Sequence, residues 1–326
     1  MIEIVKSNTA HSQYFELIFK IYGVSSETIK YVNDTKEGIN TIVSNKIPTT
    51  FFHILENNSL IGQIALINIS ENVAYFGFFE LTNLTYFNEI WKALITEAKQ
   101  LNLKNIFGPV NGTVWHPYRL IIETSLEPFF PQEPISLIEY SNLFKSNSPN
   151  HIIEFHSAFR TNYNVILEHS KVSLDILKTE NIQIIEENFS DKILKIIYDL
   201  SLSIFSHNPG FYQLSFSNFK QLYSSYESEK SQVKIFIVYH KNKPIGFSFN
   251  SLFEKKLIMK TIGILPDWQE KGIGNALVYE VHKFAKNNNI EKVIYALIRT
   301  DNKVKHFPKD DTIIFRKYAA FIYNLD

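Results

Sequence analysis

One pattern of apolar and polar residues occurs twice in this chain, and no other feature constrains its fold as strongly. Residues 52–62 read FHILENNSLIG and residues 236–246 read FIVYHKNKPIG. Each consists of two apolar runs separated by a short polar turn, which predicts a β-hairpin. Downstream, residues 91–106 and 278–293 each combine an amphipathic helical pattern with the start of an apolar strand. We therefore expect two halves of similar plan, produced by duplication of one unit.

Helix-like and strand-like stretches alternate along both halves, so the sequence predicts an α/β or α+β fold. Residues 143–155 have the composition of a linker, whereas the strand-like stretch 152–166 could still complete the first half. We place the boundary near Ser170, which gives domains of residues 1–170 and 171–326.

Composition limits the partners of the protein. Its 33 basic and 33 acidic residues give a formal net charge of +0, so we expect neither nucleic acid nor an anionic membrane as a partner. The absence of cysteine excludes disulfides and thiolate metal sites, and suits a reducing compartment. The first residues lack the apolar block of a signal peptide, and no later apolar run is long enough to span a bilayer. The sequence therefore predicts a cytoplasmic protein without a metal site.

Two glycines lie where an apolar strand gives way to an amphipathic helix. The stretch 264–281 reads ILPDWQEKGIGNALVYEV, with Gly272 and Gly274 at the start of the helical pattern. Glycine accepts positive φ and has no Cβ, so the backbone can approach a ligand and direct its N–H groups to one point. Such amides at a helix N-terminus bind phosphate. Lys271 also favours an anion there, because a cation alone opposes the helix dipole.

Other interpretations of the glycine pair fit less well. An ordinary tight turn needs at most one glycine, although the apolar residues of the helix serve packing in either case. A P-loop requires Lys and Ser or Thr after its second glycine, where this chain has Asn275 and Ala276. A dinucleotide fingerprint requires a third small residue where Leu277 stands. It also requires an acidic residue at the far end of the next strand, whereas Glu291 is at its start.

With these nucleotide motifs excluded, the stretch resembles the acyl-CoA signature of the GNAT acyltransferase superfamily. In that family a strand ends in an apolar residue followed by x-Pro, and Gln/Arg-x-x-Gly-x-Gly/Ala then opens a helix. The matching residues here are Ile264, Pro266, Gln269, Gly272 and Gly274. The resemblance covers residues 182–325 and implies a mixed, mostly antiparallel sheet flanked by helices.

The whole chain resembles a tandem arrangement of two GNAT-like domains, of which the first is degenerate. The marks of the first domain are FGFFE at 76–80 and FGPVNGTVWHPYR at 107–119. Thr85 and Phe87 stand opposite the two glycines, so we expect the first domain to lack the acyl-CoA loop. The second mark also has the composition of a polar and aromatic pocket, formed by Trp115, His116, Tyr118 and Arg119.

The resemblance implies acetyl-CoA or another acyl-CoA as cosubstrate. Main-chain amides at the start of the helix would hold its diphosphate, the Gln269 side chain would close that site, and Lys271 would add charge. The pantetheine arm would lie along the strand that ends at Ile264, and Asn302 matches an asparagine that the family uses beside this arm. The expected cofactor-binding residues are Ile264, Leu265, Gln269, Lys271, Gly272, Ile273, Gly274, Asn275, Ala276 and Asn302.

The residues that would move protons depart from the family. Many members use a glutamate on the strand that corresponds to 256–265, and this stretch contains none. A backbone N–H near Ile264 could stabilise the oxyanion of acyl transfer. The other catalytic candidates are Tyr318, His306 and His207. Each has a structural alternative, which is a strand position for Tyr318, a loop for His306 and a helix end for His207.

These features predict a cytoplasmic N-acyltransferase that transfers an acyl group, expected to be acetyl, to an amine of a small molecule or peptide. The sequence does not specify the oligomeric state. Two alternatives stay open: a CoA-binding or interaction module that has the fold without catalysis, and a structural duplication that binds no ligand. A further hypothesis, CoA binding by both halves, predicts two sites per chain.

Overall fold

The computed structural model describes residues 2–227, 231–301 and 311–325 of a mixed α/β protein. Two compact units interleave in the chain. The first unit comprises residues 1–124, 128–154 and 318–326, and the second comprises 125–127 and 155–317. The boundary expected at residue 170 stays a prediction.

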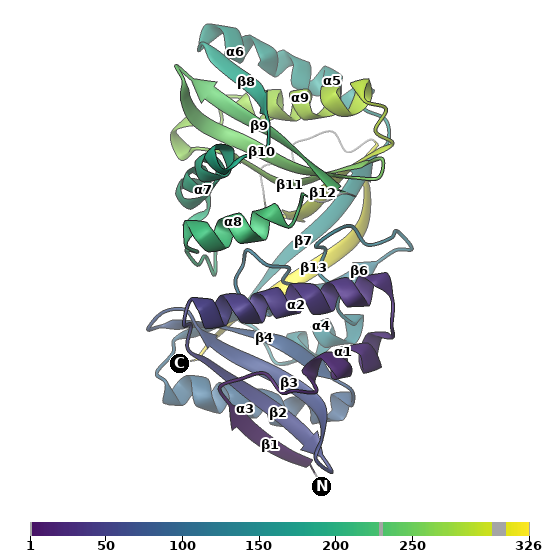
Figure 1. The fold of residues 1–326 in the computed structure, drawn as a ribbon, viewed down its shortest axis with the longest axis vertical. Helices are drawn as coiled ribbons and strands as arrows, with labels where there is room; N and C mark the ends of the chain where they lie inside the picture. Colours follow the sequence, from purple (N-terminus) through teal and green to yellow (C-terminus); the bar gives the residue numbers. More distant parts are fainter. Residues whose placement is uncertain (1, 228–230, 302–310, 326) are drawn as a thin grey trace. The chain divides into compact units, whose positions relative to one another are not determined.

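The first unit is built on one layer of strands (Figure 1). In their order across the sheet these are β1 (Ile2–Ser7), β2 (Thr49–Glu56), β3 (Ser59–Asn68), β4 (Val73–Leu81), β5 (Asn105–Gly108) and the end of β13 (Ile313–Asn324). Neighbours are antiparallel except for β4 and β5, which are parallel. The short strand β6 (Leu120–Thr124) lies off this path.

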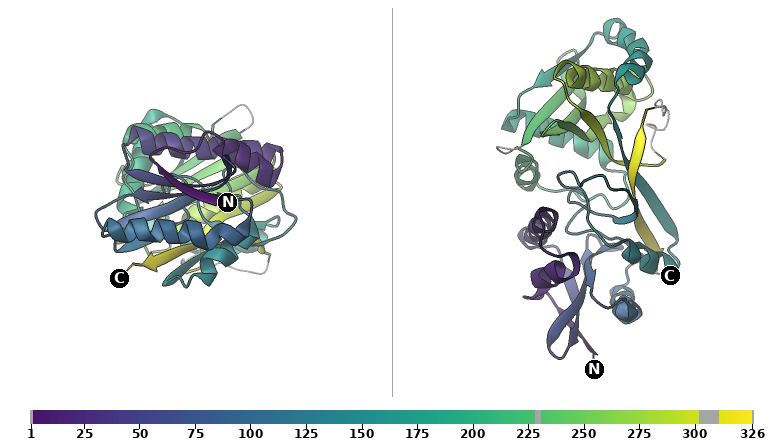
Figure 2. Two further views of the ribbon diagram at one scale, coloured as in Figure 1. Left: turned by 90° about the horizontal axis from the view of Figure 1, so that it is seen from below. Right: turned by 90° about the vertical axis from the view of Figure 1, so that its right-hand side faces the viewer.

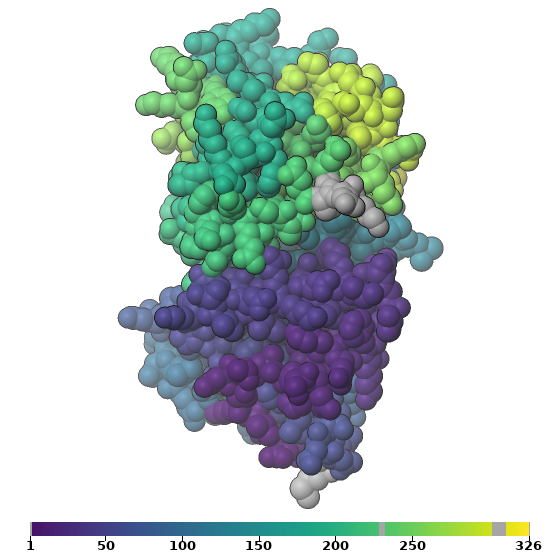
Figure 3. Space-filling view, in the orientation of Figure 1, coloured from purple at the N-terminus to yellow at the C-terminus, as the bar shows by residue number. Residues whose placement is uncertain are grey.

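Helices cover both faces of this layer (Figures 1 and 2). One face carries α1 (Tyr14–Tyr22) and α2 (Ser26–Ser44), whose outer surface is seen in Figure 3. The other carries α3 (Phe87–Gln100), which follows the 3-10 turn Leu84–Tyr86, and α4 (Ile138–Ser146). The apolar core lies on the α3 and α4 face, where the Phe76 ring lies 5.2 Å from Trp91 and 4.9 Å from Phe144.

The second unit repeats this plan. In spatial order its strands are β8 (Ile182–Glu187), β9 (Ser231–His240), β10 (Lys243–Phe253), β11 (Lys256–Ile264), β12 (Lys292–Arg299) and the end of β7 (His151–Arg160). Neighbours are antiparallel except for β11 and β12, which are parallel. The mostly antiparallel strands of both units, with their flanking helices, confirm the fold class expected from the sequence.

Two layers of helices also flank the second sheet (Figure 1). On one side lie α5 (Asn164–Lys171), α6 (Asp175–Thr179) and α9 (Ile273–Asn287), with the 3-10 turn Val172–Leu174 between α5 and α6. On the other side lie α7 (Asp191–Phe205) and α8 (Phe216–Ser224). Side chains of the strands pack against both layers of helices. Phe236 on β9 contacts Phe284 on α9, and Phe249 on β10 contacts Tyr223 on α8.

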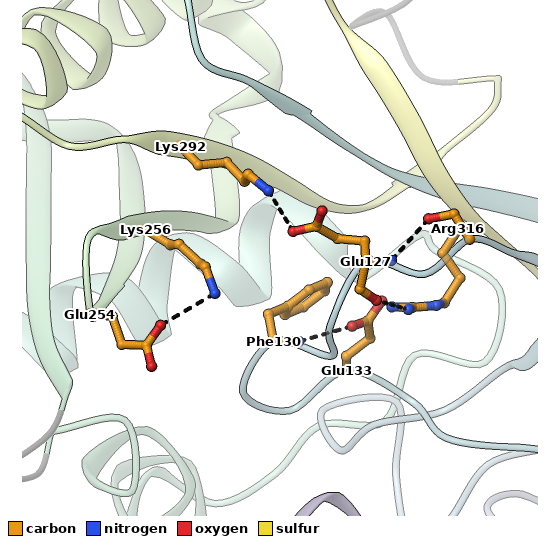
Figure 4. Close-up of polar contacts among 8 residues, drawn as sticks. Glu127, Phe130, Glu133, Glu254, Lys256, Lys292 and Arg316 are labelled. Atoms are coloured by element: carbon orange, nitrogen blue, oxygen red, sulfur yellow. Dashed lines mark hydrogen bonds and ion pairs between the residues drawn. The ribbon is translucent and has the colours of Figure 1, made fainter.

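Segments distant in the sequence complete each unit. Glu127 belongs to the second unit, where its carboxylate pairs with Lys292 at 2.6 Å and its carbonyl accepts a hydrogen bond from Arg316 at 2.6 Å (Figure 4). Strand β13 leaves the second unit after Lys317, and its residues 321–324 pair with β5 in the first. Within the described residues, no helix is long and apolar enough to cross a membrane.

Candidate functional site

The glycine pair lies at the junction between β11 and α9, as the sequence predicts. A short 3-10 turn, Pro266–Trp268, follows β11, and α9 then begins at Ile273. Gly272 is the residue before the helix and has φ of 82°, a left-handed conformation that favours glycine. At the start of α7, the Ser190 side chain accepts a hydrogen bond from the amide of Ile193. Gly272 has no side chain that could do the same for the first N–H groups of α9.

The glycine turn is not packed shut. A Cβ built on Gly274 would have no heavy atom within 4 Å, so that position faces open space. A Cβ on Gly272 would lie 3.4 Å from the hydroxyl oxygen of Ser173, in the turn before α6. An anion can therefore approach the amides of the first helical turn, and Ser173 stands beside them.

Two side chains expected to hold the coenzyme lie at the same turn. Gln269 Nε2 donates a hydrogen bond to the carbonyl oxygen of Ile264 at 2.9 Å, which ties the turn to the end of β11. Lys271 Nζ lies 4.5 Å from the centre of the Trp268 ring, and Lys271 is exposed to solvent. Their parts in binding a diphosphate stay predictions.

The strand that ends at this turn separates from its parallel neighbour. The ladder between β11 and β12 ends at the pair Met259 and Tyr295, and β12 then continues to pair with β7. The amide of Leu265 donates to Ile245 on β10, and successive residues of a strand direct their main-chain groups to opposite edges. The N–H of Ile264 therefore points to the edge from which β12 has diverged. This edge is where the sequence places the pantetheine arm.

The first unit has the same divergence, but a loop fills it. The ladder between β4 and β5 ends at Tyr75 and Phe107. Beyond that pair, the amide of Val110 donates to the carbonyl of Phe76 at 2.8 Å. The approach is so close that a Cβ on Gly77 would lie 1.8 Å from the carbonyl oxygen of Val110. The edge that is open in the second unit is therefore occupied by the protein's own backbone in the first.

The start of α3 also differs from the start of α9. Thr85 and Phe87 stand where the second unit has its glycines. The side chain of Asn83 accepts a hydrogen bond from the amide of Thr85, and the Phe87 ring is buried in the apolar core. These residues give the first unit a capped turn and a packed side chain, in place of an open glycine turn.

The catalytic candidates belong to different elements of the chain. His207 is exposed in the loop after α7. Tyr318 lies in the part of β13 that belongs to the first unit, is 0% exposed, and donates a hydrogen bond to the carboxylate of Glu133. His306 and Asn302 lie outside the described residues. The catalytic roles of all three candidates and the coenzyme contact of Asn302 stay predictions.

Strand β11 has a glycine at the position where β4 of the first unit has Glu80. Gly246 pairs with Ile264 just as Gly62 pairs with Leu81, so Gly263 on β11 corresponds to Glu80 on β4. A Cβ on Gly263 would lie 3.0 to 3.2 Å from side-chain atoms of Ile204 and Phe205 on α7. A side chain at this position would therefore require the side chains of α7 to shift by a few tenths of an ångström.

Helix α9 is fixed to the sheet through a buried histidine. His282 Nδ1 donates to the carbonyl of Val278 at 2.8 Å, so its Nε2 accepts from the hydroxyl of Tyr295 on β12 at 2.7 Å. Burial lowers the pKa of His282 to about 4, so the ring is neutral at pH 7 and both nitrogens keep their partners. The helix that begins at the glycine turn is therefore held rigidly on β12.

Ser173 and Glu80 were not assigned roles from the sequence. No local pattern connects Ser173 with the glycine turn, because the contact is made by the fold. Glu80 is marked only by its position at the end of the apolar run FGFF. Of the expected pocket residues, Tyr118 and Arg119 line a pocket beside Glu80, while His116 is buried against Thr113 and Thr41.

Comparisons with known proteins agree with this geometry. Residues 195–306 match the model of the Acetyltransferase (GNAT) family. The search of curated proteins found no match.

Several solved structures share the fold over the whole chain. A tandem GNAT protein from the clavulanic acid biosynthesis pathway aligns with 100% of this chain and 99% of its own, with a TM-score of 0.58 and 7% identity. A probable N-acyltransferase from Enterococcus faecalis aligns with 100% of this chain and 73% of its own, with a TM-score of 0.60 and 9% identity. A GCN5-related N-acetyltransferase from Anabaena variabilis aligns with 99% and 73%, with a TM-score of 0.57 and 8% identity.

At these identities the structural likeness shows the fold, and the family match lies within one part of the chain. The chain therefore contains a stretch, residues 195–306, that matches the GNAT family model, and it has the fold of tandem GNAT proteins over its whole length.

Proposed function

We propose that the protein is an acyl-CoA-dependent N-acyltransferase. Acetyl-CoA is the expected donor, and an amine of a small molecule or peptide is the expected acceptor. The observation that carries the proposal is the open turn at Gly272 and Gly274, which precedes α9 and adjoins the diverging end of β11. The second unit supplies this site, and the first unit is proposed not to bind CoA because its backbone occupies the corresponding edge.

Each part of the site has a separate task. The main-chain amides from Lys271 to Ala276 hold the diphosphate, Lys271 contributes charge, and Ser173 contributes a hydroxyl. The main chain of Ile264 and Leu265 orients the pantetheine arm, with Asn302 beside it. When bound, the thioester supplies an activated acyl group and a thiolate leaving group. The N–H of Ile264 stabilises negative charge that develops on the acyl oxygen. His207, His306 and Tyr318 are the candidates for proton transfer.

A binding experiment tests the coenzyme site. We expect calorimetry to show one acetyl-CoA per chain for the wild type, and affinity lowered at least tenfold by Gly274→Glu, for which roughly 1.4 kcal/mol of repulsion suffices. The substituted side chain has space, so it can fold while placing a carboxylate where the diphosphate binds. Ser203→Glu, which adds the same charge at an exposed position on α7, is the matched control and should bind like the wild type.

The outcomes separate the alternatives. Failure of the wild type to bind acetyl-CoA removes both ligand-dependent functions and leaves a structural duplication. Two sites per chain would contradict the exclusion of CoA from the first unit. Equal binding by Gly274→Glu would place the coenzyme elsewhere.

One alternative function has specific support. Residues 256–265 contain no glutamate, which favours a module that binds CoA without catalysis. Release of free thiol from acetyl-CoA, measured with a panel of amines, distinguishes the two. We expect at least one amine to release thiol with the wild type and none to do so with Gly274→Glu. Binding without thiol release would support the module instead. Location in the cytoplasm stays a prediction from the cysteine-free composition.

A further inference from the structure

The first unit contains a pocket around a buried carboxylate that the proposed acyl transfer does not use. The room inside it is about 20 Å³, close to that of one water molecule or one ammonium group, and the space with its open mouth included is about 380 Å³. Glu80, at the end of β4, is 0% exposed and lies in its wall. Aromatic rings from both helical layers, from β4 and from the loop after β5 line the same space, and they are those of Tyr22, Tyr31, Phe79, Tyr118 and Tyr140.

Three tyrosine hydroxyls hold the Glu80 carboxylate in place. Tyr31 from α2 and Tyr22 from α1 donate to Oε1 at 2.7 and 3.3 Å. Tyr140 from α4 donates to Oε2 at 3.0 Å. The tyrosines are themselves positioned, because Asn111 Nδ2 donates to the Tyr31 hydroxyl and the amide of Leu81 donates to the Tyr140 hydroxyl. The carboxylate is therefore oriented before any ligand arrives.

Glu80 has acceptor capacity left and no cation beside it. A carboxylate has about four acceptor positions, and the tyrosines use three of them. Among the residues that the structure describes, Glu80 forms no ion pair. The nearest cationic side chain in the pocket wall, Arg119, lies over the Tyr118 ring at 3.8 Å and donates to the Tyr118 hydroxyl at 2.9 Å. One acceptor position on Glu80 thus remains for a donor from outside.

The backbone also bends to aim Glu80 into this space. Glu80 pairs with Gln63 and Gly77 pairs with Ala65, so β4 contains an extra residue relative to β3. Phe78, inside this bulge, has φ of 48°, which is a strained conformation for a bulky side chain. Strain of this kind persists where the surrounding structure requires it, and it gathers at ligand sites.

A buried carboxylate without a counter-charge is costly for the fold, and a cationic ligand offsets that cost. The faces of aromatic rings also attract cations, and a primary ammonium group carries the donors that the remaining acceptor position requires. From this geometry we propose that the first unit binds the primary ammonium group of a small molecule, with Glu80 as its counter-ion and the pocket tyrosines around it. This site lies in the unit without the glycine turn, so it goes beyond the proposed acyl transfer and does not depend on it.

Binding should then depend on pH through Glu80. Burial raises the pKa of Glu80 to about 7, and the hydrogen bonds from Tyr31, Tyr140 and Tyr22 oppose that rise. The groups around the carboxylate are Tyr14 and Tyr22 on α1, Tyr31 on α2, Gln63 on β3, Tyr140 on α4, and Arg119 in the pocket wall. An alkylammonium probe stays protonated between pH 6 and pH 8, so its affinity follows the ionised fraction of Glu80. That fraction rises roughly tenfold over this range for a pKa of about 7.

The test uses the full chain and three probes of similar size. NMR titration with n-propylammonium, 1-propanol and butyrate should show binding of the ammonium alone, with roughly tenfold higher affinity at pH 8 than at pH 6. Glu80→Gln keeps the shape of the side chain, and it should lower the affinity at pH 8 at least tenfold and abolish the pH dependence. Acetyl-CoA binding should be unchanged in this variant, which separates this site from the coenzyme site.

A second variant distinguishes ligand binding by the ionised Glu80 from a purely structural role of this residue. Tyr31→Phe keeps the ring but removes a hydrogen bond that stabilises the ionised carboxylate. The midpoint of the pH dependence should therefore move upward, while thermal unfolding confirms that the variant is folded. Equal binding of 1-propanol and n-propylammonium, no binding of either, or unchanged affinity in Glu80→Gln would overturn the proposal.

Discussion

Glu80 shows what a single buried charge requires of its surroundings. It pairs across the sheet with Gln63, which in turn pairs with His53, and all three side chains are buried on the face that α1 and α2 cover. The opposite face of the same strands carries Phe76 in the apolar core. This face of the first unit therefore buries three polar side chains beside apolar ones such as Phe51 and Phe78.

This charge makes the stability of the first unit depend on pH. Because the pKa of Glu80 is about 7 in the folded protein and 4.5 is its ordinary value, the folded state keeps a proton that the unfolded state loses between these pH values. The free energy of unfolding should fall as pH rises through this window, by about 3 kcal/mol, and stay level above it. Below the window both states are protonated and the contribution vanishes.

Urea unfolding of wild type and Glu80→Gln between pH 4.5 and pH 8 measures this contribution, since other titrating groups cancel in the difference. Glu71→Gln, at an exposed position in the same unit, controls for the substitution itself and should change the difference far less. A difference between wild type and Glu80→Gln that does not change with pH would show that the carboxylate is not buried as described.

The sequence predicted the role of a residue where the backbone requires glycine. It did not predict contacts between residues that lie far apart in the sequence. Gly272 marked the turn before α9 because few other residues allow its left-handed backbone, whereas Gly274 lies in the first turn of the helix. The hydrogen bond from Gln269 to Ile264 and the contact of Ser173 with Gly272 could not be anticipated, because local sequence does not encode them. Tyr318 occupies the strand position that was its structural alternative.

At the scale of elements, one small difference separates the units. Both have a pair of parallel strands that diverge, β4 from β5 and β11 from β12. In the first unit the segment after β5 crosses back over β4, and Gly77 permits this approach. In the second unit the edge stays open beside the glycine turn. The two units therefore differ at this edge by a loop, not by the order of their strands.

A pair of glycine-to-alanine variants tests this account of the loop. Gly77→Ala should destabilise the protein by about 3 kcal/mol or more, because its Cβ would overlap main-chain atoms of Val110 that cannot move independently. Gly274→Ala should leave stability unchanged or raise it by up to about 1 kcal/mol, since its Cβ meets open space in a helical turn. Urea unfolding of both variants provides the comparison. Equal effects would mean that the first edge is not closed by this approach.

The elements themselves follow from periodicity. The repeated hairpin became β2 with β3 and β9 with β10, and the amphipathic stretches became α3 and α9. The segment 108–112 gave no such signal, because its conformation is set by the strand it crosses. The sequence thus predicts where the second unit is open, but not what closes the first.

At the scale of the whole molecule, the two units share one topology, but the glycine turn and the buried acid occur in different units. The second has the glycine turn and lacks an acid at Gly263, while the first has Glu80 and lacks the turn. Duplication followed by separate specialisation accounts for this pattern. The interleaving of the units was not predictable, because β7 and β13 complete sheets whose other strands lie far away in the sequence.

The central claim is that the glycine turn of the second unit, and not its counterpart in the first, holds the diphosphate of CoA. A crystal structure of the protein with acetyl-CoA tests it most directly. We expect one coenzyme per chain, with its diphosphate on the amides of residues 271–276 and its pantetheine arm along the end of β11. A coenzyme bound in the first unit, or at a distance from the glycine turn, would contradict the claim.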